Sequence, residues 1–234
     1  MAEDNGKSSN EERAIRILDA AAGLIMHYGY DKTTVSDIAH AAGVSKGAIY
    51  LHWSSKEELF DALYDHASRR YLDDWVRMFE AETDDWSFVR MFQLVLELMQ
   101  QHPFMQALHT RDQRVLGSML RRDKSLFQQK GANNTELYKK FQEVGAARDD
   151  IEPHVIAFLL NAFGYGVLTA HEVMEPGDIP SFEVLIDGLG KILDRGLEPE
   201  RGGNRSAARD LVLEMVAAVQ AQMQAKAINE GQHD

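Results

Sequence analysis

Apolar residues recur every three or four positions along most of the chain, which is the spacing of amphipathic α-helices. The first stripe lies between Glu11 and Tyr28 and consists of Ala14, Ile17, Leu18, Ala21, Leu24 and Ile25. Similar stripes run from Ser55 to about Glu80, from Phe88 to Met99, and over residues 153–174 and 181–195. Residues 112–145 have the pattern of one long helix or two, with an interruption near residues 130–134. The pattern predicts an all-α protein.

After the first stripe, small and polar residues divide the pattern into two short helical segments. Thr34 is expected to cap the first segment, with Asp37 in the capping-box position. Gly43 is expected to end it, because glycine readily adopts the left-handed backbone of a tight turn. Ser45 is expected to cap the second segment. Neither segment is long enough to be stable alone, so the flanking helices must hold them in place.

The second short segment is expected to bury one face and expose the other. Ile49 and Trp53 are four residues apart, so they point inward together. The outward positions then include Lys46, Gly47, Ala48, Tyr50, Leu51 and His52. A helix that presents its N-terminus and a narrow polar and aromatic face is what a helix-turn-helix inserts into the major groove of B-DNA. Double-stranded DNA is therefore the predicted partner of this segment.

The stretch TTVSDIAHAAGVSKGAIYLHWSSKEELFDAL, residues 33–63, resembles the DNA-binding domain of TetR family transcriptional regulators (TetR/AcrR type). The resemblance covers about residues 11–65. It implies an all-α homodimer, in which an N-terminal three-helix helix-turn-helix domain is joined to a larger helical domain for ligand binding and dimerisation. It further implies a repressor that a small effector releases from a palindromic operator.

The same resemblance assigns DNA contacts to Thr34, Ser45, Lys46, Gly47, Ala48, Tyr50, His52 and Lys56. Thr34 and Lys56 match phosphate contacts at the starts of helices, and Tyr50 and His52 match phosphate and groove contacts. Ala48 cannot hydrogen-bond a base, so it either touches a thymine methyl or leaves room for the backbone. The operator sequence is therefore not predicted.

The expected organisation has four parts. Residues 1–10 are polar and are expected to be disordered, residues 11–56 form the DNA-binding domain, and residues 57–195 form the ligand-binding and dimerisation domain. Residues 196–234 contain a linker and an extra amphipathic helix through Leu211, Met215, Val219 and Met223. This helix goes beyond the minimal family layout. The sequence leaves open whether it docks on the body, extends a dimer surface or is partly mobile.

Residues 153–174 and 181–195 are the most apolar helices of the body, and the family's corresponding helices form a four-helix bundle between two protomers. The dimer-interface residues expected on this basis are Phe163, Gly164, Leu168, Leu185, Leu189 and Ile192. The alternative is that both helices are internal core helices. Dimerisation is favoured, because a single DNA-binding domain contacts too little DNA for tight binding.

A hydrophobic or aromatic effector is the predicted ligand, because the body is rich in methionine and aromatic residues, which suit adaptable binding sites. The expected ligand-binding residues are Met91, Phe92, Met99, Phe104, Met119, Phe158, Asn161 and Tyr165. Asn161 and Tyr165 would supply the few polar groups that orient a ligand in such a pocket. The alternative for each apolar residue is plain core packing.

The net charge of -12 argues against a general coat for nucleic acid. The first 56 residues contain six basic and seven acidic side chains, so nearly all the negative charge lies in the rest of the chain. A near-neutral DNA-binding segment can still bind DNA, since salt screens the repulsion between the DNA phosphates and the acidic rest of the chain beyond about 10 Å.

Other function classes are less well supported by the sequence. The chain has no cysteine, which excludes disulfides and thiolate zinc sites. No cofactor or metal site is predicted, and no phosphate loop, nucleophile elbow or zinc-protease motif indicates an enzyme. No secretory signal and no membrane-spanning run is expected, so the protein is predicted to be cytoplasmic. A helical protein–protein adaptor without specific DNA binding, or an all-α enzyme, remains the alternative.

Overall fold

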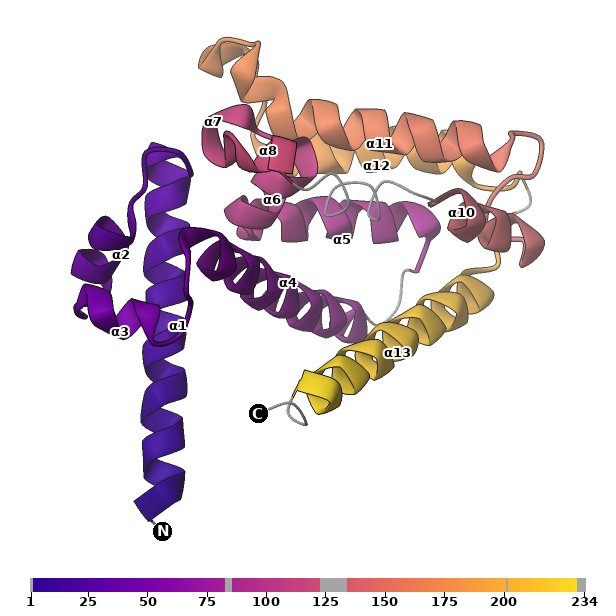
Figure 1. Cartoon of the computed structure of the whole chain (residues 1–234). Helices are drawn as coiled ribbons and strands as arrows, with labels where there is room; N and C mark the ends of the chain where they lie inside the picture. Colours follow the sequence, from indigo (N-terminus) through magenta and orange to yellow (C-terminus); the bar gives the residue numbers. More distant parts are fainter. Residues whose placement is uncertain (1, 83–85, 123–133, 201, 231–234) are drawn as a thin grey trace. The chain divides into compact units, whose positions relative to one another are not determined.

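A computed structural model of the chain describes residues 2–82, 86–122, 134–200 and 202–230. Within these ranges every regular element is a helix, which confirms the predicted fold class (Figure 1). The chain divides into two compact units, in which segments that are distant in sequence come together. Unit 1 consists of Met1–Arg70 and His102–Phe127, and unit 2 consists of Tyr71–Gln101 and Gln128–Asp234.

Unit 1 contains three N-terminal helices, the start of a long fourth helix and three short helices from the middle of the chain. They are α1 (Ala2–Tyr28), α2 (Val35–Ala42), α3 (Lys46–Tyr50), the beginning of α4 (Lys56–Ala81), α6 (Pro103–Thr110), α7 (Gln113–Leu116) and α8 (Met119–Arg122). Its core is built from Ile17, Ala21, Ile25, Ile38, Ile49, Leu59, Phe60 and Leu63, each at most 1% exposed. The N-terminal helices thus bury the apolar stripes that the sequence pattern indicated.

Two features of unit 1 differ from the expected organisation. The helix α1 already begins at Ala2, so residues 2–10 are helical where a disordered tail was expected. Adding turns to a helix that is already nucleated costs little, and this explains the extension. In addition, the chain from His102 onward packs with the N-terminal helices: the Phe104 ring meets Phe60 edge-on, with ring centroids 5.9 Å apart, and Tyr30 N donates to Val115 O at 2.8 Å. The boundary at residue 57 is therefore not the boundary between the units.

Gly29 is a position in unit 1 where only glycine fits. It ends α1 with a φ of 84°, and a Cβ built on it would lie 2.5 Å from the backbone oxygen of Arg114. Gly43 has a similar φ of 67° but open space around it. We expect Gly43→Ala to cost about 1 kcal/mol of unfolding free energy, from backbone strain alone. Gly29→Ala should cost about 3 kcal/mol, because overpacking adds to the strain.

Chemical denaturation of the two glycine variants tests this difference. Since both substitutions add one methyl group at a left-handed position, Gly43→Ala is the matched control for Gly29→Ala. Equal losses in the two variants would show that the contact with Arg114 does not constrain residue 29.

Unit 2 is a layered helical body. Its helices are the remainder of α4, α5 (Phe88–Gln101), α10 (Asn134–Glu143), α11 (Pro153–Thr169), α12 (Phe182–Leu197) and α13 (Arg205–Glu230), with short 3₁₀ turns η1 (Ala170–Glu172) and η2 (Pro176–Asp178). α5 packs against both α11 and α12, and α10 packs against α11 and α13. The core includes a run of aromatic side chains, of which Phe79, Phe88 and Phe141 are at most 1% exposed. Of the expected one or two helices over residues 112–145, the structure describes α7, α8 and α10, with a break at Gly117; residues 123–133, and with them most of the expected interruption, lie outside the described residues.

The C-terminal helix α13 docks on unit 2, which decides one of the alternatives that the sequence left open. Ala208, Val212 and Val216, each at most 3% exposed, belong to the core of the unit. At its start, Asn204 Oδ1 accepts a hydrogen bond from Ala207 N at 3.2 Å, and Arg205 pairs with Glu198 at 3.2 Å. Leu211, Met215 and Val219 of the expected stripe lie beside the buried one and are only half-buried, while the side chain of Met223 lies outside the described part of the chain.

Asp194, near the end of α12, is an unfavourably placed carboxylate in this unit. Its Oδ1 is buried without a hydrogen-bond partner, and burial raises its pKa although Ser87 donates a hydrogen bond to it. Burial and the nearby Asp194 together raise the pKa of Glu198. A carboxyl group with a raised pKa favours the folded state while it is protonated. The contribution of Asp194 to the free energy of unfolding is therefore fully present below the ordinary aspartate pKa of 3.8 and is lost as the pH rises through the raised pKa.

Asp194→Asn should therefore raise the melting temperature at pH 7 by about 2 °C, and the gain should vanish below the ordinary aspartate pKa. Thermal melts at several pH values measure this. Glu198→Gln should give a smaller gain, because Glu198 is already paired with Arg205. A lower melting temperature of Asp194→Asn at pH 7 would contradict the idea that the charge is unfavourable there.

Candidate nucleic-acid interface

The helix α2 is fixed at both ends by the residues that the sequence indicated. Thr34 Oγ1 accepts a hydrogen bond from Asp37 N at 3.2 Å, and Thr34 N donates to Asp37 Oδ2 at 3.0 Å, so the capping box is complete. Hydrogen bonds from Thr34 hold the pKa of Asp37 below its ordinary value. Gly43 closes the helix in the left-handed conformation, and Val44 N donates to Ala39 O at 2.9 Å. The corner between α2 and α3 is therefore set locally.

The helix α3 has a buried anchor and an exposed leading edge. Ile49 is 1% exposed and ties the helix to unit 1, while Ser45 Oγ accepts a hydrogen bond from Ala48 N at 3.1 Å at its start. On the other side Lys46 and Gly47 are exposed, and Tyr50 is 48% exposed. The expected outward orientation of these three residues is confirmed.

Two of the expected contact residues are less exposed. Ala48 and His52 are both half-buried, and the His52 ring lies against Trp53 with centroids 5.2 Å apart. Trp53 is itself half-buried, as expected for a residue that packs α3 on its neighbours. His52 thus has a packing role beside any contact with DNA.

Lys56 does not extend from the surface as a phosphate contact would. Its Nζ donates a hydrogen bond to Tyr30 O and lies 3.9 Å from the centroid of the Tyr30 ring. Burial lowers its pKa, while Asp31 and Glu57 act in the opposite direction. In this structure the cation joins α4 to the loop before α2, and the phosphate contact expected of Lys56 stays a prediction.

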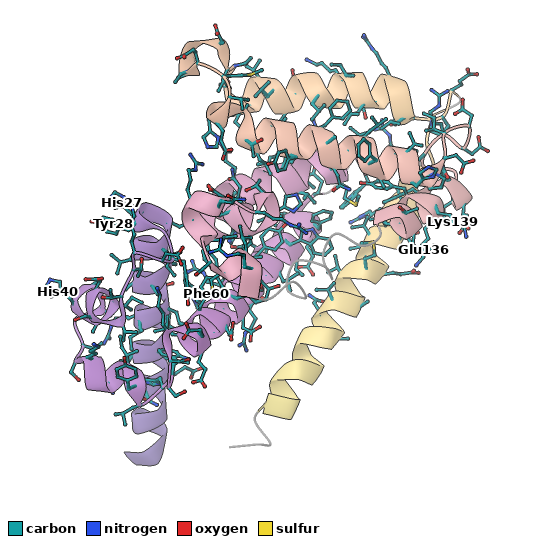
Figure 2. All side chains as sticks on the ribbon, turned by 45° about the horizontal axis from the view of Figure 1, so that its top comes forward. His27, Tyr28, His40, Phe60, Glu136 and Lys139 are labelled. Atoms are coloured by element: carbon teal, nitrogen blue, oxygen red, sulfur yellow. The ribbon has the colours of Figure 1, made fainter. Side chains whose placement is uncertain are left out.

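Sequence reasoning missed other exposed groups on and between the N-terminal helices. Lys32 is exposed two residues before the N-cap of α2, and His40 projects from the outer side of α2 (Figure 2). His27 and Tyr28 are exposed at the end of α1. A cation just before a helix N-cap is the signal that could have identified Lys32, since phosphates bind at helix N-termini.

The expected ligand-binding residues do not form one pocket. Met91 and Phe92 are buried in the core of unit 2, with Met99 half-buried beside them, whereas Phe104 and Met119 are buried within unit 1. The remaining three lie on the outside of α11: Phe158 is 71% exposed, Tyr165 is 50% exposed, and Asn161 is exposed with its amide bonded to Ala157 O of its own helix. The placement of these three in an interior pocket was wrong.

The expected dimer residues are also divided between two sides of their helices. Phe163 and Ile192 are exposed, and Leu185 and Leu189 are half-buried. Gly164 and Leu168 instead face the interior, where a Cβ on Gly164 would lie 3.3 Å from Leu96 Cδ2. Their assignment to a dimer surface was wrong, because Gly164 provides the space for α5.

An apolar surface nevertheless covers the outside of α11 and α12. We call the outer face the set of exposed apolar residues Val155, Phe158, Leu159, Phe163, Tyr165, Val184 and Ile192. Contrary to the expectation from sequence, Pro153–Glu172 is long and apolar enough to cross a membrane by length and composition, and only 28% of its most apolar window is buried. An unpartnered outer face on a core helix accounts for that composition.

No group of three or more His, Asp or Glu residues in the described ranges is placed to hold a metal ion. The geometry instead offers a capped helix-turn-helix with an exposed leading edge. Residues 17–63, from the middle of α1 to the second turn of α4, match the family model described as bacterial regulatory proteins, tetR family. This segment is a TetR-family DNA-binding domain.

Relatives support this assignment beyond the helix-turn-helix. The HTH-type transcriptional regulator TtgR of Pseudomonas putida is 27% identical over 183 residues, which cover 78% of this chain and 80% of TtgR. The HTH-type transcriptional repressor KstR2 of Rhodococcus jostii is 43% identical over 70 residues, 30% of this chain and 31% of KstR2.

Solved structures agree in fold. A transcriptional regulator from Saccharomonospora viridis, in complex with choline, has a TM-score of 0.61 at 18% identity and covers 81% of this chain and all of its own. At this identity the likeness concerns the fold alone. With this domain and this relative, the protein is a DNA-binding transcriptional regulator and not an enzyme.

Proposed function

We propose that this protein is a homodimeric repressor that inserts α3 of each protomer into the major groove of a palindromic operator and leaves it when a small effector binds. The observation that carries the proposal is the leading edge of α3: the cap at Ser45, the exposed Lys46 and Gly47, and the outward Tyr50. Such an edge meets both phosphates and base edges in a helix-turn-helix complex. KstR2, one of the relatives, is a transcriptional repressor.

The DNA contacts follow from the same geometry. Lys46 and Tyr50 are the principal DNA contacts of α3. The small residues Gly47 and Ala48 allow the backbone of α3 to approach the bases closely. Thr34 contacts a phosphate at the start of α2, where backbone N–H groups favour an anion. Its hydroxyl donates to Asp37 Oδ2 at 2.6 Å in the free protein, so it must exchange that partner for the phosphate. Lys32, exposed just before this cap, is a further phosphate contact.

Dimerisation is proposed through the outer face. Phe158 and Ile192 are 71% and 67% exposed, which is costly for large apolar side chains unless a partner covers them. Pairing α11 and α12 with the same helices of a second protomer gives a twofold interface, in which each contact occurs twice. A twofold dimer in turn requires a palindromic operator.

The effector is proposed to bind in unit 2, the part of the chain that is not occupied with DNA. The hydrophobic or aromatic effector expected from the sequence remains a prediction. Met91 and Phe92, its best-placed contacts, are only 5% and 8% exposed, so an apolar effector must open a packed core. The cytoplasm, where operator DNA is found, is the proposed location.

Selection of bound sequences from a pool of random duplex DNA tests the proposal. We expect a partly palindromic site whose half-sites lie about one helical turn apart or slightly more. A variant with Lys46 and Tyr50 both replaced by alanine, selected in parallel, should enrich no sequence. Enrichment of asymmetric single sites alone would contradict a twofold dimer, and no enrichment by the native protein would contradict the operator itself.

A further inference from the structure

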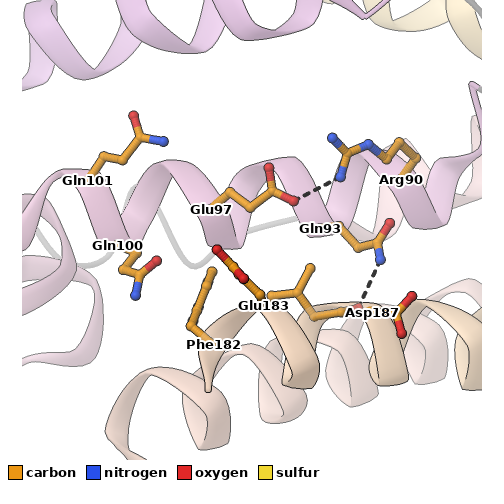
Figure 3. Close-up of a pocket in the computed structure, with 9 residues that line it drawn as sticks. Arg90, Gln93, Glu97, Gln100, Gln101, Phe182, Glu183 and Asp187 are labelled. Atoms are coloured by element: carbon orange, nitrogen blue, oxygen red, sulfur yellow. Dashed lines mark hydrogen bonds and ion pairs between the residues drawn. The ribbon is translucent and has the colours of Figure 1, made fainter. Parts of the chain in front are cut away.

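A groove of about 490 Å³ lies between α5 and the first turns of α12, within unit 2 (Figure 3). This volume is within the range of small-molecule sites. The groove is lined by Arg90, Gln93 and Glu97 of α5 and by Phe182, Glu183 and Asp187 of α12, among others. None of the residues predicted from the sequence as ligand-binding lines it.

The lining is negatively charged, because it contains three carboxylates and a single guanidinium group. That guanidinium is already engaged: Arg90 Nη1 donates to Glu97 at 2.8 Å, and Arg90 Nε and Nη2 each donate to Glu82 at 3.2 Å. An anionic ligand would therefore find no available cation in the lining. The charge balance favours a cationic occupant.

The groove contains hydrogen-bond acceptors that an occupant can reach. Gln93 Nε2 donates to Ile186 O at 2.9 Å, which fixes the amide and leaves its Oε1 as an acceptor. Gly190 permits this arrangement, because a Cβ at that position would overlap Gln93 Nε2. Glu183 and this carbonyl oxygen can accept hydrogen bonds from an occupant, and ammonium groups donate such bonds.

The spacing of the carboxylates indicates a ligand with a charge at each end. Glu183 and Asp187 are one helical turn apart on α12, or about 6 Å along its axis, and Glu97 faces Glu183 from α5. The helix dipole favours an acidic residue in the first turn of α12, so Glu183 alone would not indicate a ligand-binding site. Asp187 pairs with Lys191 at 2.6 Å, but both side chains are about two-thirds exposed, so exchanging this partner costs little.

Phe182 supplies an apolar wall beside Glu183 and Gln100 (Figure 3). A chain of methylene groups can lie on its half-buried ring while ammonium groups at the two ends reach the carboxylates. From the volume, the charge, the acceptors and the wall together, we infer that this groove binds a small aliphatic diamine. The site is separate from the operator-binding surface and goes beyond the proposed repression.

Isothermal titration of the full chain with 1,4-diaminobutane tests the inference in about 0.15 M salt, where general attraction to an acidic protein is screened. We expect saturable binding of one molecule per chain. Butane-1,4-diol, which has the same length without charge, should give no saturable signal. Glu183→Gln should weaken diamine binding by about fivefold, the effect of one partly exposed ion pair.

The control variant is Glu214→Gln, which removes one exposed carboxylate from α13, away from the groove. It should bind the diamine as the native protein does. Because Glu183 and Asp187 are exposed, the double variant Glu183→Gln with Asp187→Asn should stay folded and lose binding. Absence of saturable binding to the native chain, equal binding of the diol, or equal losses in Glu183→Gln and Glu214→Gln would each overturn the inference.

Discussion

Replacing Lys46 and Tyr50 together by alanine should weaken operator binding by about 100-fold or more while the protein stays folded. The two side chains extend from the exposed edge of α3, whereas Ile49 holds the helix in place from its buried side. Each lost contact is expected to cost about 1–3 kcal/mol for a base or to reduce the salt slope by about one unit for a phosphate. Both losses occur twice in a twofold complex.

Fluorescence anisotropy with a labelled operator, at several salt concentrations, measures both quantities. Lys139→Ala is the matched control, since Lys139 is an exposed lysine on α10 in unit 2 and pairs with Glu143 of its own helix. It should change neither affinity nor salt slope. If the double variant of Lys46 and Tyr50 binds the operator with unchanged affinity, α3 is not part of the DNA interface.

Introducing acidic residues into the outer face should convert the proposed dimer into monomers. In the double variant Phe158→Glu with Ile192→Glu, the twofold interface loses four large apolar side chains, each contributing about 1.5–3 kcal/mol when buried. We expect the dimer dissociation constant to rise by more than about 1,000-fold. Operator affinity should fall as well, because a single DNA-binding domain contacts little DNA.

Sedimentation velocity reports the oligomeric state directly. Ile15→Glu makes the same kind of change at a 41% exposed apolar side chain on α1 in unit 1 and should leave the dimer intact. If the outer-face variant sediments as the native protein does, α11 and α12 are not the interface. If the native protein is a monomer even when bound to its operator, the twofold proposal fails as a whole.

The helix-turn-helix could be predicted almost residue by residue. Its helices are short, and their ends depend on local chemistry: the Thr34 hydroxyl, the Asp37 carboxylate, the left-handed Gly43 and the Ser45 cap. Such signals act within a few residues of the chain, so sequence spacing is enough to locate them. Lys56 shows the limit of this reasoning, since its contact with Tyr30 joins residues 26 positions apart.

The orientation of α11 could not be predicted in the same way. The helix is apolar on almost every side, so periodicity does not tell which side faces the core. Gly164 and Leu168 proved to face α5 and the core, while Phe158 and Tyr165 proved to face outward. Residues expected at a ligand thus lie partly on the outside of the helix, and residues expected at a partner lie partly in the core. The groove beside α12 was missed because it depends on the distant pairing of Gln93 with Ile186.

The contribution of α13 to the core of unit 2 has a consequence for synthesis of the protein. A ribosome completes all of the chain that unit 1 needs by Phe127, whereas unit 2 lacks Ala208, Val212 and Val216 until translation is almost finished. Domains generally fold as units while the chain emerges. A nonsense mutation shortly after Leu197 would therefore yield a product whose operator-binding half is whole, but whose other half has an open apolar core that chaperones and proteases recognise.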